Sequence, residues 1–534
     1  MFFVSVVRPP AIVLATLNAK YIHASLGLRY LLANMARHGG VDLREQTVLR
    51  EFTISREPQE IVAELIATLD GASGIKVVGL GVYIWNVTQT CEVVRQLKAL
   101  CPEVIVVLGG PEVSHEVQQQ EIVKLADHVI TGWGDVSFPK LCRALLHGPQ
   151  PLMKIIAGEQ PPLEQIDLPY SLYSQDDLAH RLLYVEASRG CPFKCEFCLS
   201  SLDKTAWAFD LDRFLIELEG LYQRGARNFK FVDRTFNLKI DASLTILQFF
   251  LERLSDGLFV HFEVIPDHLP DRLKDKIAQF PKGVLQFEVG IQSFNVEVQQ
   301  RISRRQDNDK TEANLRWLVE ASQVHLHTDL IFGLPGESLA SFADGFDRLY
   351  GIGPHEIQLG ILKRLRGTPI DRHSVEYAMV YDHLPPYTVL QTRDVSRDDR
   401  RRFARLARYW DLVANSGRFK QSLALLLVTP SPFSAFLDFS DWLWADSRSC
   451  HGKTSGLTPE ILVDALFDYL SLAQGLDPGL VRDSLLADYV QSGARARPEC
   501  LRDVLPKPLN PVSRSVRSQA QRQERHAPHA KISA

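Results

Sequence analysis

Three of the eight cysteines of the chain lie within eight consecutive positions, in the stretch Gly190-Cys191-Pro192-Phe193-Lys194-Cys195-Glu196-Phe197-Cys198. Their spacing is C-x3-C-x2-C, and closely spaced thiolates of this kind are typical ligands of metals, above all of iron–sulfur clusters. Three protein ligands fit a four-iron cluster that keeps one iron open for a substrate. A structural zinc site needs four ligands, so zinc is an alternative with Cys142 or Cys450 as a distant fourth.

The residues around the trio bear on its environment. Arg189, Lys194 and Glu196 are charged, which favours a loop over three cysteines packed in a core. Arg189 and Lys194 are the nearby cations in the sequence, and we expect them to favour the thiolate form of the cysteines.

The motif, with the aromatic Phe197 directly before its last cysteine, resembles the signature of the radical SAM enzymes. The resemblance implies a [4Fe–4S] cluster whose open iron is chelated by the amino and carboxylate groups of S-adenosylmethionine (SAM). It also implies that an electron from the cluster cleaves the sulfonium and releases a 5′-deoxyadenosyl radical. Phe197 matches the family position that packs near the adenine.

Length and composition indicate a large protein with several domains. The 534 residues suggest three or four domains, and 45% hydrophobic with 23% charged residues is ordinary for a globular chain. The net charge of −4 provides no overall field that attracts nucleic acid or membranes. The apolar run from Met1 to Val7 is too short to span a membrane. The other five cysteines are scattered, which predicts a reducing, cytoplasmic compartment.

Residues 11 to about 147 alternate between predicted strands and helices. The predicted strands are 11–15, 77–82, 104–108 and 129–131, and the predicted helices are 26–37, 87–100 and 137–146. Continuous apolar strands separated by helices predict an α/β fold, a doubly wound parallel sheet covered on both faces. Ligands bind such sheets at the loops that follow the carboxyl ends of the strands.

Two of these loops are rich in glycine, namely Gly109-Gly110-Pro111-Glu112 and Gly132-Trp133-Gly134-Asp135. Glycine allows the backbone to approach a ligand closely. The arrangement resembles the Rossmann-like cobalamin-binding domain that precedes many radical SAM enzymes, and it implies that Gly109, Gly110, Gly132 and Gly134 contact cobalamin. The chain departs from the family at Asp135, where the family has Glu, and at Gly81-Val82-Tyr83, which does not match a Ser-x-Leu element.

The loop after the first strand bears on the lower face of the cobalt. In cobalamin domains of the methionine synthase type, an Asp-x-His-x-x-Gly motif supplies an imidazole ligand. Here the loop reads Tyr21-Ile22-His23-Ala24-Ser25-Leu26-Gly27, so Tyr replaces Asp and the glycine falls one residue late. A ligating imidazole usually has its other nitrogen held by a second group. We therefore predict that His23 does not bind cobalt and that Ser25 caps the following helix.

A second alternating pattern begins at Arg181, after a connector rich in proline and polar residues. The predicted strands are 182–186, 228–232, 259–264, 284–289, 326–331 and 356–359. Six βα units match the partial (β/α)6 TIM-type barrel that the radical SAM resemblance implies, with its site at the carboxyl ends of the strands.

Polar residues stand at those strand ends. The resemblance places Asp233 at the amino group of SAM, Glu288 or Gln292 at the ribose, and the loop from Gly333 to Glu337 beside the adenine. The full set of candidate SAM contacts is Phe197, Asp233, Glu263, Glu288, Gln292, Ser293 and Gly333. Each could instead be a solvated strand end, and their joint occurrence with the cysteines favours a site.

Beyond about residue 376 the chain is predicted to be mainly helical. Residues 396–414 form a charged amphipathic pattern with Ser396 as a cap, and Phe433, Phe436, Phe439 and Trp442 recur every three residues. We interpret this aromatic stripe as core. The region resembles the helical C-terminal extension, of unknown function, of one subgroup of cobalamin-linked radical SAM proteins.

The predicted organisation is a cobalamin-binding domain, a linker, a radical SAM core, a helical domain and a basic disordered tail. Their predicted ranges are 1–150, 151–180, 181–375, 376–495 and 496–534. Contact of the tail with nucleic acid is conceivable, but a solvated tail is favoured.

These features predict a cytoplasmic, cobalamin-dependent radical SAM enzyme. The resemblance implies methyl transfer to an unactivated carbon, in which the deoxyadenosyl radical removes a hydrogen atom and methylcobalamin donates the methyl group. A radical rearrangement, cyclisation or ring contraction is an alternative, and a non-catalytic iron–sulfur or cobalamin sensor is another. The expected partners are a substrate, either a small molecule or a peptide, and an electron donor such as flavodoxin or ferredoxin, with no membrane contact.

Overall fold

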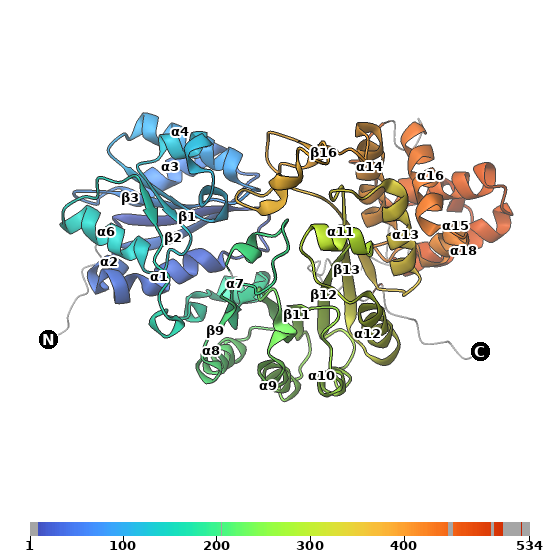
Figure 1. The fold of residues 1–534 in the computed structure, drawn as a ribbon, viewed down its shortest axis with the longest axis horizontal. Coiled ribbons are helices and arrows are strands. Elements are labelled where there is room, and N and C mark those ends of the chain that lie inside the picture. The colour runs from blue at the N-terminus through green and yellow to red at the C-terminus, as the bar shows by residue number, and fades with distance from the viewer. Residues whose placement is uncertain (1–8, 204, 447–451, 493–495, 506–524, 526–534) are drawn as a thin grey trace.

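The structure is a computed structural model that describes residues 9–203, 205–446, 452–492, 496–505 and 525. Figure 1 shows an N-terminal α/β unit, a central curved sheet with helices along its outer side, and a helical C-terminal unit. Cys450 and most of the predicted tail lie outside the described residues.

The N-terminal unit is a parallel six-stranded sheet in the order β2-β1-β3-β4-β5-β6. The strands are β1 (Ile12–Asn18), β2 (Thr47–Thr53), β3 (Val77–Gly81), β4 (Ile105–Gly109), β5 (His128–Thr131) and β6 (Ile155–Ala157). The helices are α1 (Leu26–Gly39), α2 (Val41–Glu45), α3 (Pro58–Leu69), α4 (Val87–Leu100), α5 (Glu121–Leu125) and α6 (Ser137–His147). Separate apolar cores lie on the two faces of the sheet, with α3 and α4 above it and α1 below in Figure 1. The predicted doubly wound sheet is confirmed.

The linker is where the structure differs from the predicted division of the chain. Strand β6 lies within residues 151–180 and pairs with β5 as the last strand of the first sheet. The rest of this segment contains α7 (Gln175–His180), whose N-cap Ser174 forms a capping box with Asp177. Part of the predicted linker therefore completes the N-terminal unit, and its short strand was obscured by the surrounding prolines.

The central unit is a second parallel sheet in the order β14-β13-β12-β11-β10-β7. Its strands are β7 (Leu183–Val185), β10 (Asn228–Phe231), β11 (Phe259–Glu263), β12 (Leu285–Gln292), β13 (His325–Phe332) and β14 (Glu356–Ile361), so all six predicted strands are confirmed. The helices that follow them include α8 (Leu211–Gln223), α9 (Ile240–Leu251), α10 (Asp271–Ile277), α11 (Val296–Arg301), α12 (Asn308–Ala321) and α13 (Leu339–Tyr350).

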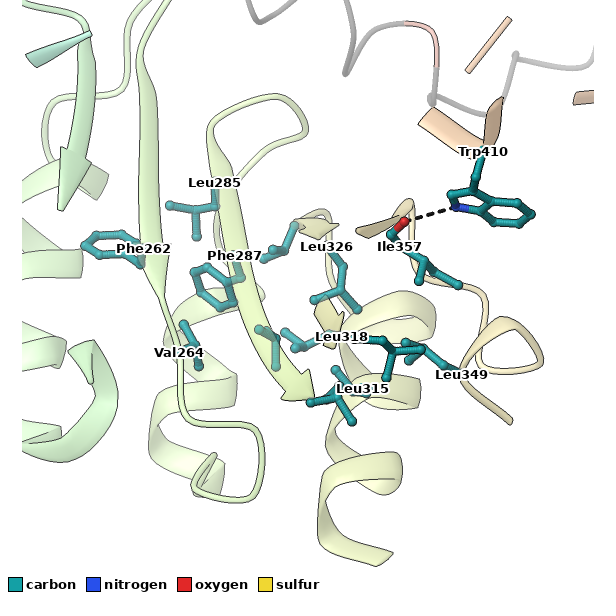
Figure 2. Packing of buried hydrophobic residues seen from close by; sticks show 14 of the residues in the cluster. Phe262, Val264, Leu285, Phe287, Leu315, Leu318, Leu326, Leu349, Ile357 and Trp410 are labelled. Carbon is teal, nitrogen blue, oxygen red and sulfur yellow. Dashed lines mark hydrogen bonds between the residues drawn. The ribbon is translucent and has the colours of Figure 1, made fainter. Parts of the chain in front are cut away.

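Alternation along these strands separates an apolar outer face from a polar inner face. Phe262 and Phe287 are buried in the core that also contains Leu315 and Leu318 of α12, as Figure 2 shows. The alternate positions carry Glu263 in β11, Lys230 in β10 and the other polar residues Glu288, His327 and Asp329. The outer face therefore holds the barrel together, while the inner face is available for a site.

The C-terminal unit packs against the edge of the barrel. It consists of a hairpin, β15 (Val380–Tyr381) and β16 (Val389–Gln391), followed by α14 (Arg397–Val413), α15 (Lys420–Leu427), α16 (Pro432–Ala445), α17 (Pro459–Asp468) and α18 (Pro478–Gln491). Trp410 donates its indole N–H to the carbonyl of Ile357 at 3.0 Å (Figure 2), and the Asn415 amide bonds the N–H and the carbonyl of the same residue. The unit thus covers the edge strand β14.

The predicted cap and aromatic stripe of this unit are confirmed. Ser396 caps α14 through a capping box with Asp399. Phe433, Phe436 and Phe439 are at most 2% exposed, and Trp442 is partly buried and packs against the same core, so the stripe is core. The predicted tail differs from the expected disorder at its described start, because residues 496–505 contain a short helical turn with a buried Leu501.

Among the described helices, no single one is long and apolar enough to cross a membrane. One pair, α15 and α16, meets the length and composition requirement together, with a bend of 106° between the two helices.

Candidate cofactor sites

The three cysteines line a cavity of ≈ 270 Å³ at the carboxyl ends of the barrel strands. They approach from the loop after β8 (Ser188–Arg189), opposite polar side chains from β11, β12 and β13. The residues that line the cavity include Cys191, Cys195, Phe197, Cys198, Arg234, Glu263, Glu288, Gln292, Arg304 and Asp329. The structure therefore brings the trio and four predicted contacts, Phe197, Glu263, Glu288 and Gln292, to one place.

Three other predicted contacts lie outside this cavity lining. Asp233 is 4% exposed, and its carboxylate accepts hydrogen bonds from the Ser188 hydroxyl at 2.5 Å and the Ala187 N–H at 2.9 Å. Burial raises the pKa of Asp233 to about 7. Its predicted contact with the SAM amino group stays a prediction, and in the structure the carboxylate holds the strand that leads to the cysteines.

Ser293 and Gly333 are likewise engaged elsewhere. The Ser293 hydroxyl donates to Glu337, and burial raises the pKa of Glu337 to about 7. Gly333 has a φ of +89°, and a Cβ there would lie 2.6 Å from Cγ1 of Val389 in the C-terminal hairpin. Ser293 and Gly333 therefore contact other parts of the chain and do not line the cavity.

The cavity contains groups suited to both charged ends of an amino acid. The Arg304 guanidinium lies 3.7 Å from Sγ of Cys195, where it could receive a carboxylate. Oδ1 of Asp329 is buried and makes no hydrogen bond within the described residues, and Nε2 of His327 lies 3.6 Å from it. Burial raises the pKa of Asp329 well above its usual range, with the neighbouring Glu288 and Glu263 adding to the rise. An ammonium group would bond this oxygen, so Arg304 and Asp329 are the groups of the cavity suited to the carboxylate and the amino group of SAM.

Sequence reasoning did not assign roles to Arg304 and Asp329. Arg304 follows α11 in a charged run, Arg304-Arg305, which gives no sign that one of the two arginines turns towards a cysteine. Arg234 also lines the cavity, and its guanidinium bonds both oxygens of Glu263, at 2.8 and 2.9 Å.

The charges around the thiols differ from those predicted. Burial raises the pKa of Cys191 to about 11 and also raises that of Cys195, where the Arg304 cation opposes the rise. Arg189 was expected to favour the thiolates, but its guanidinium is bound to Asp135 at 2.9 Å and Glu186 at 2.7 Å. Arg304 therefore takes the role expected of Arg189 at Cys195, and we expect bound iron to stabilise the thiolates further.

The zinc alternative finds no support from Cys142. That residue is fully buried in α6, within the core of the N-terminal unit, and burial raises the pKa of its thiol. Cys450 lies outside the described residues. Among the described part of the chain, no three His, Cys, Asp or Glu side chains are arranged to hold a single metal ion.

A second cavity, of ≈ 320 Å³, opens at the carboxyl ends of β3, β4 and β5. All four glycines that were predicted to contact cobalamin line it: Gly109, Gly110, Gly132 and Gly134. Gly79 of β3 forms part of the same wall, and a Cβ there would lie 2.7 Å from the Phe138 ring. A wall of glycines with mainly apolar neighbours suits the long nucleotide tail of cobalamin, because side chains at these positions would fill the space.

The backbone conformation at position 110 and the lack of space beside it both require glycine. It has a φ of +111°, and a Cβ would lie 2.4 Å from the carbonyl oxygen of Val82. Gly109, in contrast, has only the carbonyl of Ile130 near its Cβ position, at 3.8 Å. A side chain at Gly109 would therefore point into open space beside the cavity.

The segment before the cysteines connects the walls of the two cavities. Arg189 lines the glycine cavity, two residues from Cys191, and binds Asp135 of the Gly132–Asp135 loop. The indole N–H of Trp133, in the same loop, donates to Asp203 at 3.1 Å. The loop predicted to contact cobalamin is thus fixed to the segments on both sides of the cysteine motif.

His23 is not among the residues that line either cavity. Its Nδ1 lies 2.7 Å from the hydroxyl of Tyr184 on β7, and its backbone forms a parallel bridge with Leu182. Burial lowers the pKa of His23. Ser25 caps α1 by accepting a hydrogen bond from the Leu28 N–H, as predicted.

Three family profiles match the chain in the order that the fold suggests. Residues 12–142 match the B12 binding domain, and residues 185–349 match the radical SAM superfamily. Residues 375–533 match a family described as a protein of unknown function, DUF4080.

The chain is also similar to characterised proteins. It is 25% identical over 347 residues to the cobalamin-dependent radical SAM methyltransferase TokK of Streptomyces tokunonensis, covering 58% of this chain and 50% of TokK. It is 25% identical over 338 residues to the 2-(S-pantetheinyl)-carbapenam-3-carboxylate methyltransferase of Streptantibioticus cattleyicolor, covering 56% of this chain and 48% of that protein. The chain therefore spans about half the length of these relatives.

Solved structures share the fold. The cobalamin-dependent SAM radical enzyme OxsB, with aqua-cobalamin and SAM bound, matches with a TM-score of 0.58 and 13% identity over 97% of this chain and 83% of OxsB. The radical SAM methyltransferase TsrM of Kitasatospora setae matches with a TM-score of 0.54 and 16% identity over 71% of this chain and 79% of TsrM.

Fold, cavities and family profiles together define a radical SAM protein with a cobalamin-binding domain. More particularly, the B12-binding profile precedes the radical SAM profile in this chain, and the DUF4080 profile follows it. Its cofactors are those of the two matched domains, a [4Fe–4S] cluster with SAM and cobalamin.

Proposed function

We propose that the protein is an enzyme that uses SAM and cobalamin to transfer a methyl group to an unactivated carbon. The observation that supports this most is the pairing of the two cavities, one lined by the cysteine trio and the other by the predicted glycines, with Arg189 between them. The names of the relatives TokK and the carbapenam methyltransferase, both methyltransferases, support the reaction type.

When bound, the cluster with SAM supplies a radical initiator and cobalamin supplies a methyl carrier. The residues of the chain bind and orient these groups. Cys191, Cys195 and Cys198 hold the cluster, while Arg304 and Asp329 orient the two charged ends of SAM. The buried walls of the barrel mouth exclude water from reactive species.

The substrate of this proposal is a small molecule or peptide that reaches the region between the two cavities. An electron donor such as flavodoxin or ferredoxin would reduce the cluster, in a reducing cytoplasmic setting. A sensor would need no groups for the charged ends of SAM, so the presence of both Arg304 and Asp329 in the lining of the cysteine cavity favours an enzyme.

The cluster gives the first test. After anaerobic reconstitution, the protein should hold about four irons and four sulfides, and Cys191→Ala, Cys195→Ala or Cys198→Ala should abolish this content. Cys101→Ala, which changes a cysteine of the N-terminal unit, is the matched control and should keep the iron. A triple variant that retains its iron would overturn the proposal.

The reaction is tested with methyl-labelled SAM and a metabolite extract under reducing conditions. Label recovered on a carbon of an extract component would support methyl transfer. Cleavage of SAM with label found nowhere but in methionine and unused SAM would favour a rearrangement or cyclisation instead. A protein that holds the cluster and cobalamin but never cleaves SAM would be the sensor.

A further inference from the structure

One segment of the chain contacts both loops that carry the predicted cofactor residues. Residues 364–387, here called the strap, follow β14 and run through the first half of the C-terminal hairpin. Near their start and end they bond the loop after Gly109-Gly110, and in their middle they bond the cysteine loop. Residues 364–374 of the strap lie between the radical SAM profile and the DUF4080 profile, and residues 375–387 lie within the DUF4080 profile.

On the cobalamin side the strap forms hydrogen bonds with a buried carboxylate. Glu112, two residues beyond Gly110, is 4% exposed. It accepts hydrogen bonds from the Arg366 guanidinium at 2.8 Å and from the Tyr387 hydroxyl at 2.6 Å. Arg366 and Arg364 also bond the carboxylate of Glu116, each at 3.1 Å. A buried carboxylate depends on such partners, so this contact fixes where the loop lies.

The backbone of the strap packs closely against the loop at this contact. Gly367 has a φ of +80°, and a Cβ there would lie 2.3 Å from Cγ of His115. Glu116 and Tyr387 adopt left-handed conformations, with φ values of +52° and +54°, which non-glycine residues rarely hold without support. Because residues of both the loop and the strap hold this uncommon conformation, the contact constrains the backbones of both segments.

On the cluster side the strap forms hydrogen bonds with a second buried carboxylate. Glu196, which lies directly between Cys195 and Phe197, is 3% exposed. Its carboxylate bonds Nε2 of His373 at 2.8 Å and the Arg372 guanidinium, and its carbonyl accepts the Ile370 N–H at 3.1 Å. The position of the cysteine loop is therefore tied to the middle of the strap.

We propose that the strap is a positioning element that sets the distance and orientation of cobalamin relative to the iron–sulfur cluster. Glu112 with Arg366 and Tyr387 positions the cobalamin loop, and Glu196 with His373 positions the cysteine loop. Two cofactors that act on one substrate must be held in a defined geometry, because small displacements of reacting groups reduce the rate strongly. The strap supplies this geometry from a segment that lines neither cavity. The inference rests on the proposed placement of the two cofactors and not on the reaction that they perform.

Both cofactors can be made paramagnetic, which allows a direct measurement. In reconstituted, full-length protein that contains the reduced cluster and cob(II)alamin, pulsed EPR reports the distance distribution between the two centres. Wild type should give one narrow distribution. Arg366→Met should broaden and shift the distribution, and Arg366→Lys should restore it in part. Tyr387→Phe, which removes only one hydroxyl group, should broaden it less.

Arg143→Met is the matched control. It removes an arginine that pairs with Asp42 inside the N-terminal unit, away from the strap, and it should leave the distribution unchanged. If Arg366→Met no longer retains cobalamin, Tyr387→Phe provides the decisive measurement. Holoproteins of the strap variants that give the wild-type distribution would overturn the proposal. A wild type that binds no cluster or no cobalamin would instead contradict the proposed function.

Discussion

Arg304 is the side chain that we expect to set the affinity for SAM. Its guanidinium lies beside Sγ of Cys195 at the mouth of the barrel. A hydrogen bond to a charged group contributes about 1.5–3 kcal/mol, so Arg304→Met should weaken SAM binding roughly 10- to 100-fold while the cluster remains. A SAM titration followed by EPR of the cluster measures this effect.

Arg316→Met, on the exposed side of α12, should bind SAM as the wild type does. Equal affinity of the Arg304 variant would move the carboxylate contact elsewhere.

Asp233 should make stability depend on pH. Its pKa is about 7 in the folded chain because of burial, against an ordinary value of 3.8. Between these values the folded state keeps a proton that the unfolded chain has released, so stability falls as pH rises through this window, by about 1.4 kcal/mol per pH unit for this one group. Asp233→Asn removes the effect. The melting temperature of this variant minus that of the wild type should therefore increase as the pH is raised from 5 to 8.

The control for this measurement is Asp241→Asn, whose side chain is 88% exposed. It should show the same pH dependence as the wild type. A constant difference in melting temperature between Asp233→Asn and the wild type at all pH values would show that Asp233 is ionised throughout.

At the scale of single residues, side-chain direction limited what the sequence could predict. Glu263 and Glu288 were predicted to contact SAM from their places near the carboxyl ends of strands and from the family resemblance, and both line the cavity. Asp233 follows its strand, where periodicity ends, and its carboxylate turns to Ala187 and Ser188 instead. No local pattern contains this information, because the two partners lie more than forty residues earlier in the chain.

At the scale of elements, the loop after β4 should decide whether cobalamin enters. Gly109→Val places a side chain beside the cavity without straining the backbone, since Gly109 has only one atom within 4 Å of its Cβ position. This variant should lose cobalamin, measured by absorbance after reconstitution, and keep its iron. Gly220→Val is the control, because a Cβ at that helical position meets nothing within 4 Å.

Gly110→Val should behave differently from Gly109→Val. A side chain at Gly110 was expected to fill space needed by the nucleotide tail, but the structure shows that it would first collide with the carbonyl of Val82. Gly110→Val should therefore lower the melting temperature of the cobalamin-free chain as well. Normal cobalamin binding by Gly109→Val would mean that the tail does not pass this loop.

The strands that the sequence predicted contain buried apolar residues, consecutive in β3 and alternating with polar residues in β13. Strands β3, β4 and β13 are mostly buried and were found at nearly their observed bounds. Strand β2 was not predicted, because it is an edge strand that contains Arg50 and Glu51 and is only partly buried. Strand β6 has three residues and no fully buried one. These two edge strands carry too little apolar periodicity to be separated from loops.

At the scale of the whole molecule, the contacts between units could not be read from the sequence. Arg189 precedes the cysteine motif and was expected to act on it, yet it binds Asp135 of the N-terminal unit. Glu196 was recognised only as a charged loop residue, yet it is buried against the strap. Each contact joins residues more than fifty positions apart, and its partner is set by how the units pack.

The packing of the units also leads to a prediction for cobalt. The loop that supplies a histidine ligand in some cobalamin domains is here attached to the barrel, because His23 bridges to Leu182 and its ring bonds Tyr184. The nucleotide tail of cobalamin, once it lies in the glycine cavity, cannot reach the cobalt. We therefore predict base-off cobalamin without a histidine ligand, and the EPR spectrum of the cob(II)alamin form should show no nitrogen superhyperfine splitting. His23→Ala should leave this spectrum unchanged, whereas splitting that is present in wild type and vanishes in His23→Ala would show that the loop leaves the barrel to bind cobalt.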